Sequence, residues 1–309
     1  MTHNHTEHTR YPKNVHAFYI GFDLLDNGLE QDKLSFYNEL FDDIPAFAFG
    51  PEVLEEKCNS LGIVPTLREA LKNIYAIPEI QEASIEYLES NNTEDKYIKR
   101  GEFGELLLYH LLHEYFDADA LISKIYFKDS KSLPAHGFDA VHVDVGNQIL
   151  WLGESKLYVS GTRAIDELVK DVIGFTDAKR QFHKGHFSTD FFNTEFQIIT
   201  NRVHGSKYNY PDFIKKLIDP STKTLDKLAS INVALFAGFE SSVLESYGTK
   251  EFEDKLSNEI SRLKDRSNEG LSTHAWNNNL NLYLFLFPVD NKRELVSALH
   301  QKLKGGQQL

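Results

Sequence analysis

Two strand-like runs joined by a turn constrain this chain more than any other feature. They occupy residues 137–159, GFDAVHVDVGNQILWLGESKLYV, and flank the pair Gly146-Asn147. Gly at the first loop position is typical of a two-residue type II′ hairpin. In that register Asp139 lies directly opposite Glu154. Side chains alternate faces along a strand, so Lys156 shares the face of Glu154. The sequence therefore predicts an antiparallel hairpin with two carboxylates and one amine at one end.

The two opposed carboxylates favour a bound cation. Directly opposed residues have Cβ atoms about 5 Å apart, and opposed like charges destabilise the pair. A hard divalent ion such as Mg²⁺ prefers oxygen ligands and would offset the repulsion between Asp139 and Glu154. The rest of this predicted face is apolar, formed by Val141, Val143, Val145, Leu150 and Leu152. A salt-bridged sheet end is the alternative, since Glu-x-Lys arises often by chance, but the register and the apolar face favour a metal site.

A third carboxylate lies upstream of the hairpin. The segment RGEFGELLLYHLLH, residues 100–113, has the apolar spacing of a buried amphipathic helix. Glu105 shares its apolar face, where a carboxylate is costly unless it has a partner. Glu102 lies near the first turn, where the helix dipole favours an acid. We therefore expect Glu105, rather than Glu102, to belong to the site.

The order of these elements resembles a known nuclease architecture. A helix with Glu105, a strand with Asp139, and a strand with Glu154 and Lys156 precede a second helix, as in the PD-(D/E)xK nuclease superfamily. Phe138 stands where the superfamily's name has Pro, and the acid itself is in place. More closely, the chain resembles the HamA family, the nuclease subunit of the Hachiman anti-phage system. The similar segments are RGEFGELLLYHLL, HGFDAVHV, ILWLGESKLY and LYLFLFP, over roughly residues 93–309, and less specifically the region from VHAFYIGFD.

The resemblance implies an activity and a partner. It implies a Mg²⁺-dependent (or Mn²⁺-dependent) deoxyribonuclease with Glu105, Asp139, Glu154 and Lys156 as catalytic residues, the three acids being metal ligands. It also implies a helicase subunit of the HamB type, which holds the nuclease in check until phage DNA disturbs the complex. Two other interpretations stay open, a stand-alone restriction-type endonuclease and a non-catalytic interaction subunit with a nuclease fold.

The pattern of elements predicts the fold class. Alternating strands and helices favour an α/β core with a mixed central sheet flanked by helices, and the resemblance implies a restriction-endonuclease-like core. The polar stretch at 89–96 would separate a smaller α+β N-terminal region, residues 1–92, from a nuclease domain, residues 93–309. Strands are expected at NVHAFYIGFDLL, EFQIIT, SINVALFAGF and NLYLFLFPV, an extended piece at PAFAFGP, and helices in LLDNGLEQDKLSFYNELFDDI, TLREALKNIYA, 165–173, 250–267 and KRELVSALHQKL.

The charge distribution bears on DNA binding. A net charge of −13 argues against general binding to nucleic acid, because phosphate contacts depend on Lys and Arg. One basic cluster, KRQFHKGH at residues 179–186, offers Lys179, Arg180 and Lys184 as candidates for DNA contacts. A basic helix C-terminus that complements the helix dipole is the alternative, and both interpretations stay open at this point.

Several other classes of protein find no support in the sequence. Cys58 is the only cysteine, so an intrachain disulfide is excluded. The polar start lacks an apolar signal region, and no apolar run approaches the roughly 20 residues of a membrane span, so we expect a cytoplasmic protein. No GxxxxGK[ST] or GxGxxG motif is present, which leaves ATP hydrolysis to a partner. We expect the histidines His3, His5 and His8 to lie in a solvated tail rather than at a metal.

Overall fold

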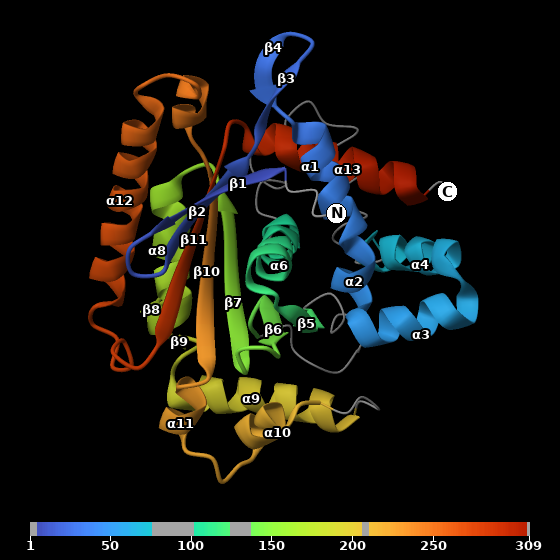
Figure 1. The fold of residues 1–309 in the computed structure, drawn as a ribbon. Coiled ribbons are helices and arrows are strands. Elements are labelled where there is room, and N and C mark those ends of the chain that lie inside the picture. The colour runs from blue at the N-terminus through green and yellow to red at the C-terminus, as the bar shows by residue number, and fades with distance from the viewer. Residues whose placement is uncertain (1–4, 76–101, 124–136, 206–209, 308–309) are drawn as a thin grey trace.

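A seven-stranded mixed sheet forms the centre of the molecule, with helices on both faces (Figure 1). The structure, a computed structural model, describes residues 5–75, 102–123, 137–205 and 210–307. The strands, in spatial order, are β1 (Thr6–Tyr11), β2 (Val15–Ile20), β11 (Asn281–Val289), β10 (Ile231–Glu240), β7 (Ile149–Tyr158), β6 (Ala140–Asp144) and β5 (Asp119–Ser123). This architecture confirms the predicted α/β class with a mixed, helix-flanked sheet.

The direction of the strands changes across the sheet. The neighbouring pairs β2–β11, β11–β10 and β10–β7 are parallel, whereas β1–β2, β7–β6 and β6–β5 are antiparallel. β10 lies between two parallel neighbours and is buried along almost its whole length. A strand covered on both faces needs apolar side chains on both. This explains why SINVALFAGF shows little alternation of polar and apolar residues.

The helices form two layers around the sheet (Figure 1). α8 (Gly161–Ile173) and α12 (Phe252–Leu271) cover one face, and α6 (Glu102–Phe116) and α13 (Lys292–Gln307) lie on the other. The other helices are α1 (Lys33–Asp42), α2 (Ile44–Phe49), α3 (Pro51–Leu61), α4 (Ile63–Tyr75), α9 (Thr189–Gly205), α10 (Asp212–Ile218), α11 (Thr224–Leu228) and the short 3-10 helix η1 (Ser242–Ser246). Two separate hairpins are β3 (Phe22–Leu25) with β4 (Gly28–Gln31), and β8 (Gly174–Thr176) with β9 (Phe182–Lys184). No helix in the described ranges is both long and apolar enough to span a bilayer.

Two predicted elements are wrong, and both form helices. PAFAFGP lies largely in α2, because Pro is tolerated in the first helical turn, where its missing N–H would be unpaired in any case. EFQIIT lies inside α9. Phe192, Phe196, Ile199 and Val203 are buried there at alternating spacings of four and three. This helical period needs a window longer than the six residues that suggested a strand. The predicted strands β2, β10 and β11 and the helices α1, α4, α6, α8, α12 and α13 are confirmed.

The N-terminal region contributes two strands to the central sheet. β2 pairs with β11 in parallel, with Val15 opposite Leu284. The predicted boundary at 89–96 lies outside the described residues, so a division at residue 92 stays a prediction. His8 belongs to β1 rather than to a solvated tail, since its Nε2 lies 2.9 Å from Nδ1 of His16 and its ring stacks on Phe18. His5 does not lie in a solvated tail either, since its Nδ1 is 3.2 Å from Oδ2 of Asp32 and its N–H donates to the carboxylate of Glu39. His3 lies outside the described residues.

Candidate active site

The β6–β7 hairpin has the predicted register. Val141 pairs with Leu152 and Ala140 with Gly153. The next positions outward on the two strands are therefore Asp139 and Glu154, as the sequence predicted. Because the strands separate at this point, the two side chains lie at the end of the hairpin rather than within its ladder.

The turn of this hairpin differs from the prediction. Asp144 pairs with Ile149, so four residues, 145–148, connect the strands. The positive φ belongs to Gln148, at 58°, so the predicted two-residue type II′ turn is wrong. Asp144 explains the longer loop, because its carboxylate accepts hydrogen bonds from the backbone N–H and the side-chain amide of Asn147, both at 2.8 Å. Such side-chain bonds to nearby backbone groups stabilise turns.

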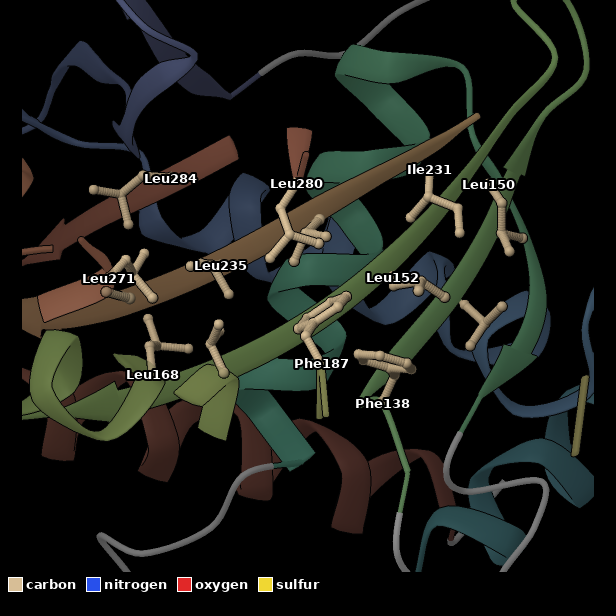
Figure 2. Close-up of a cluster of buried hydrophobic side chains, with 14 of the residues drawn as sticks. Phe138, Leu150, Leu152, Leu168, Phe187, Ile231, Leu235, Leu271, Leu280 and Leu284 are labelled. Carbon is tan, nitrogen blue, oxygen red and sulfur yellow. The ribbon is translucent and has the colours of Figure 1, made fainter. Parts of the chain in front are cut away.

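The apolar face beneath the charges is present, with one exception. The buried cluster on the α8 side of the sheet contains Val141, Val143, Leu150 and Leu152. Figure 2 shows the last two together with Phe138, the residue that precedes Asp139. Val145 lies exposed in the turn and does not belong to this face. Glu154 and Lys156 continue the face of Leu150 and Leu152 along β7 by strand alternation.

Asp139 is bound to the edge of β7. Its Oδ2 accepts hydrogen bonds from the backbone N–H of Ser155, at 2.9 Å, and from Ser155 Oγ, at 3.0 Å. Asp139 is 5% exposed, and β6 begins at the next residue. Asp139 thus accepts a hydrogen bond from the backbone of β7 just beyond the end of β6, the neighbouring strand. This pair of bonds fixes the orientation of Asp139.

Replacing Ser155 by Ala is expected to destabilise the fold. The change removes one of the two described hydrogen bonds to a buried carboxylate, and such charge-assisted bonds each contribute about 1.5–3 kcal/mol. Urea unfolding followed by circular dichroism measures the loss. Ser221→Ala is the matched control, because Ser221 N–H and Oγ both donate to Asp219 in the same manner but at an exposed position. Equal stability of the two variants would contradict the structural role given to Ser155.

Glu154 is an ionisable group in an unfavourable position. It is 2% exposed, and burial raises the pKa of its carboxyl group, which the charge of Asp139 raises further. His186 and Lys156 act in the opposite direction but leave the pKa raised. His186 Nδ1 lies 2.6 Å from Glu154 Oε1. Burial alone would lower the pKa of His186, yet the nearby acids, Glu154 first, outweigh it and raise that pKa.

Lys156 is held by a residue of α8. Its Nζ lies 2.5 Å from Oδ2 of Asp171. Burial would lower the pKa of the amine, but Glu154, Asp171 and Asp139 together outweigh burial and raise it. Lys156 is therefore a fixed cation at neutral pH, with three carboxylates around it.

The sequence did not single out Asp171 and His186 as members of this site. The backbone carbonyl of Asp171 accepts a hydrogen bond from the N–H of His186, at 2.7 Å, so the two residues also fix each other. The ring of His186 stacks on Phe191, with centroids 4.4 Å apart, and meets Phe138 edge-on. The one sequence signal for His186 was its place at the end of the basic cluster, residues 179–186. No sequence spacing linked it to Glu154.

Glu105 lies in the first turns of α6 and is 4% exposed, which confirms its predicted burial. Its neighbour Gly104 packs against β7, where an added Cβ would lie 3.3 Å from Ser155 Oγ. The start of α6 is therefore beside the residue that binds Asp139. Participation of Glu105 in the site stays a prediction. The side chain of Glu102 lies outside the described part of the structure.

The basic cluster lies on a hairpin and not at a helix end. α8 ends at Ile173, and Gly174, with a φ of 86°, caps it. The interpretation as a basic helix C-terminus is therefore wrong. Lys179 and Arg180 are exposed at the tip of the β8–β9 hairpin, and Lys184 pairs with Asp190. DNA contacts by these residues stay a prediction.

The donors that this site offers to a metal are the two carboxylates of Asp139 and Glu154, which lie close enough to repel each other. Within the described residues, no group of three or more His, Cys, Asp or Glu side chains is arranged to hold a metal. Zn²⁺ sites need three or four protein ligands. Mg²⁺ is commonly bound through one or two carboxylates, with water and substrate phosphate completing its shell. Asp139 and Glu154 supply two buried, mutually repelling carboxylates of this kind.

Comparison with known proteins gives one match. The model of the HamA family matches residues 1–303. No curated protein and no solved structure matches the chain. The matched range includes all the candidate site residues and also strands β1 and β2 at the N-terminus.

Proposed function

Because the chain belongs to the HamA family, a component of the Hachiman defence system, we propose that it is a metal-dependent deoxyribonuclease. The observation that carries the proposal is the register of β6 and β7, which opposes Asp139 and Glu154 with Lys156 on the same face. The reaction would be hydrolysis of a phosphodiester bond in DNA. The helicase of the same system would be its partner.

The two carboxylates would hold the metal. Asp139, oriented by Ser155, and Glu154, next to His186, would bind one or two Mg²⁺ (or Mn²⁺) ions, with Glu105 contributing through water. When bound, the metal supplies a Lewis acid that lowers the pKa of the attacking water and stabilises charge on the phosphate. Asp139 and Glu154, which repel each other in the absence of an ion, would be less strained with a cation between them. His186 would hold Glu154 in place from the side of the β8–β9 hairpin.

Lys156 would act on the reacting groups. Its amine is a compact charge that suits two tasks, orienting the attacking water or stabilising the extra negative charge on the phosphate. The carboxylate of Asp171 positions this amine, with its Oδ2 2.5 Å from Nζ of Lys156. A fixed cation requires no reorganisation when charge develops, which is the main advantage of a preorganised site.

We predict that the isolated chain binds duplex DNA weakly at physiological salt. The net charge is −13, and binding through a few basic residues falls steeply as salt rises. We also expect it to co-purify with a larger ATP-hydrolysing protein encoded beside it. A net charge of −13 suits docking on a basic partner. Fluorescence anisotropy at several salt concentrations and tagged co-expression measure the two expectations. Tight, sequence-specific duplex binding by the free chain would instead favour a stand-alone restriction-type endonuclease.

A cleavage assay tests the proposed activity. The purified chain, with and without the helicase, is incubated with plasmid, linear duplex and single-stranded DNA in Mg²⁺, in Mn²⁺ and in EDTA. We expect cleavage that requires the metal, shows little sequence preference, and changes with the helicase and ATP. Absence of cleavage under all conditions, with an intact complex, would favour the non-catalytic interaction subunit.

A further inference from the structure

The β8–β9 hairpin carries both of the exposed aromatic side chains found in the described residues. Phe182 is 63% exposed and Phe175 is 39% exposed. Phe175 lies opposite His183 and stacks on it, with ring centroids 4.8 Å apart, whereas Phe182 lies opposite Thr176 on the other face. Aromatic rings bury more apolar area than most side chains. Phe182, the more exposed of the two and on the face opposite to the Phe175–His183 stack, leaves a large apolar ring open to a ligand.

The tip of this hairpin adds positive charge. Lys179 and Arg180 are exposed, and neither forms an ion pair with another residue that the structure describes. The acid of the hairpin, Asp177, is engaged in the turn. Its Oδ1 accepts hydrogen bonds from the N–H groups of Lys179 and Gln181, and its Oδ2 lies 3.2 Å from Nε2 of His183. The tip therefore presents two cations on a chain that is acidic as a whole.

Arg180 occupies a position where glycine is favoured. Its φ is 61°, in the left-handed region. Its N–H donates to the carbonyl of Asp177, and the N–H of Asp177 donates to the carbonyl of Gln181. This is a three-residue hairpin loop that ends in a left-handed residue, which is usually glycine. Arg180 therefore places a charged side chain at the loop position where glycine would be least strained.

The base of the hairpin is fixed to the candidate active site. Gly185 packs so closely on the end of α8 that an added Cβ would lie 2.2 Å from the carbonyl oxygen of Val172. The next residue, His186, donates its N–H to Asp171 and lies against Glu154. Phe182 precedes His186 by four residues, and an extended chain rises about 3.3 Å per residue, so the two are at most roughly 13 Å apart. Phe182 is therefore joined by one short segment to the residue that contacts Glu154.

We propose that the β8–β9 hairpin binds unpaired DNA, with Phe182 stacking on a base and Lys179 and Arg180 contacting phosphates. Stacking on an aromatic side chain tolerates any base but requires that the base face be free, which a duplex does not offer. Positive charge at the tip complements the phosphate backbone. The hairpin would guide a single strand to Asp139 and Glu154. The inference rests on the proposed nuclease function and names its substrate as single-stranded DNA.

Binding measurements on the full chain in EDTA test this proposal without cleavage. The probes are a fluorescein-labelled single strand of mixed sequence and the corresponding duplex. Phe182→Leu, which keeps an apolar side chain but removes the ring, is expected to weaken single-strand binding about fivefold or more. Phe182→Trp restores it to within about twofold. Leu225→Ala, a truncation of an exposed leucine on α11, is the control and leaves binding unchanged.

Arg180 gives a second, independent readout. Arg180→Gly removes one phosphate contact and should reduce the slope of log K against log salt by about 0.7 for a single strand. Its melting temperature should stay the same or rise, because glycine accepts the left-handed φ without strain. Arg180→Lys retains the salt slope. A loss of binding with a lowered melting temperature in Arg180→Gly would overturn the assignment to a phosphate contact.

The outcomes separate this proposal from the nuclease proposal. Unchanged single-strand binding by Phe182→Leu, or an equal loss for duplex and single strand, overturns the role of the hairpin. Loss of helicase co-purification with unchanged DNA binding would assign the hairpin to protein docking and also overturns it. If no preparation cleaves DNA but Phe182→Leu weakens single-strand binding, the nuclease proposal fails and this one stands.

Discussion

Replacing Glu154 by Gln is expected to reduce metal-dependent DNA cleavage at least about a hundredfold. Loss of a residue that merely supports a metal ligand costs 10- to 100-fold, so loss of a ligand should cost no less. Gln keeps the volume of the buried side chain and removes its charge. Cleavage rates at several Mg²⁺ concentrations measure the effect. Glu167→Gln, which changes an acid of α8 that pairs with Lys170, is the control and should cleave normally.

The same variant makes a prediction about stability. The folded-state pKa of Glu154 is raised, so its ionisation costs stability once the pH rises above the pKa of the unfolded chain. At neutral pH, Glu154→Gln removes this cost, and the variant in EDTA should melt at the same temperature as the wild type or higher. Mg²⁺ should raise the melting temperature of the wild type, since a ligand that binds the folded state stabilises it. It should not raise that of the variant. Near-wild-type cleavage by a folded Glu154→Gln protein would show that Glu154 is not a residue of the active site.

Lys156→Met is expected to reduce cleavage by about a hundredfold or more while leaving metal binding intact. Removal of one preorganised group that stabilises transition-state charge typically costs 10²–10³ in rate. Met has a similar length and lacks the charge. The acids around Lys156 remain, so the attraction for a divalent cation should stay the same or increase. The shift of the melting temperature with Mg²⁺ and the cleavage rate together distinguish the two effects.

Two further variants sharpen the test of Lys156. Lys170→Met removes a half-exposed lysine of α8 that pairs with Glu167 and should leave cleavage unchanged. Lys156→Arg should not restore activity, because a planar guanidinium cannot occupy the place of a compact ammonium beside Asp171. Full activity of Lys156→Met would show that the salt bridge to Asp171 is structural only. It would then favour the alternative interpretation, in which these residues form a salt-bridged end of the sheet and no active site.

The sequence by itself determined those features that depend on periodicity within one element. Alternation supports the register of β6 and β7, because a slip of one residue would turn the apolar face of Leu150 and Leu152 to the opposite side; the predicted turn gave the same pairing although its type was wrong. Helices α8 and α12 follow from apolar residues three and four apart. The burial of Glu105 follows from the same helical period.

The tertiary structure alone decided how separate elements meet. Glu154 and His186 are 32 residues apart, and Lys156 and Asp171 are 15 apart, yet both pairs are in contact because α8 packs on β7 and the β8–β9 hairpin returns the chain to its end. Such contacts depend on the angle and distance between packed elements, which no local spacing encodes. The helical state of EFQIIT is a different case, because the helical period of Phe192, Phe196, Ile199 and Val203 is present in the sequence but needs a longer window than six residues. The turn after Asp144 was decided by one side chain that binds Asn147, and this local choice left the register of the strands unchanged.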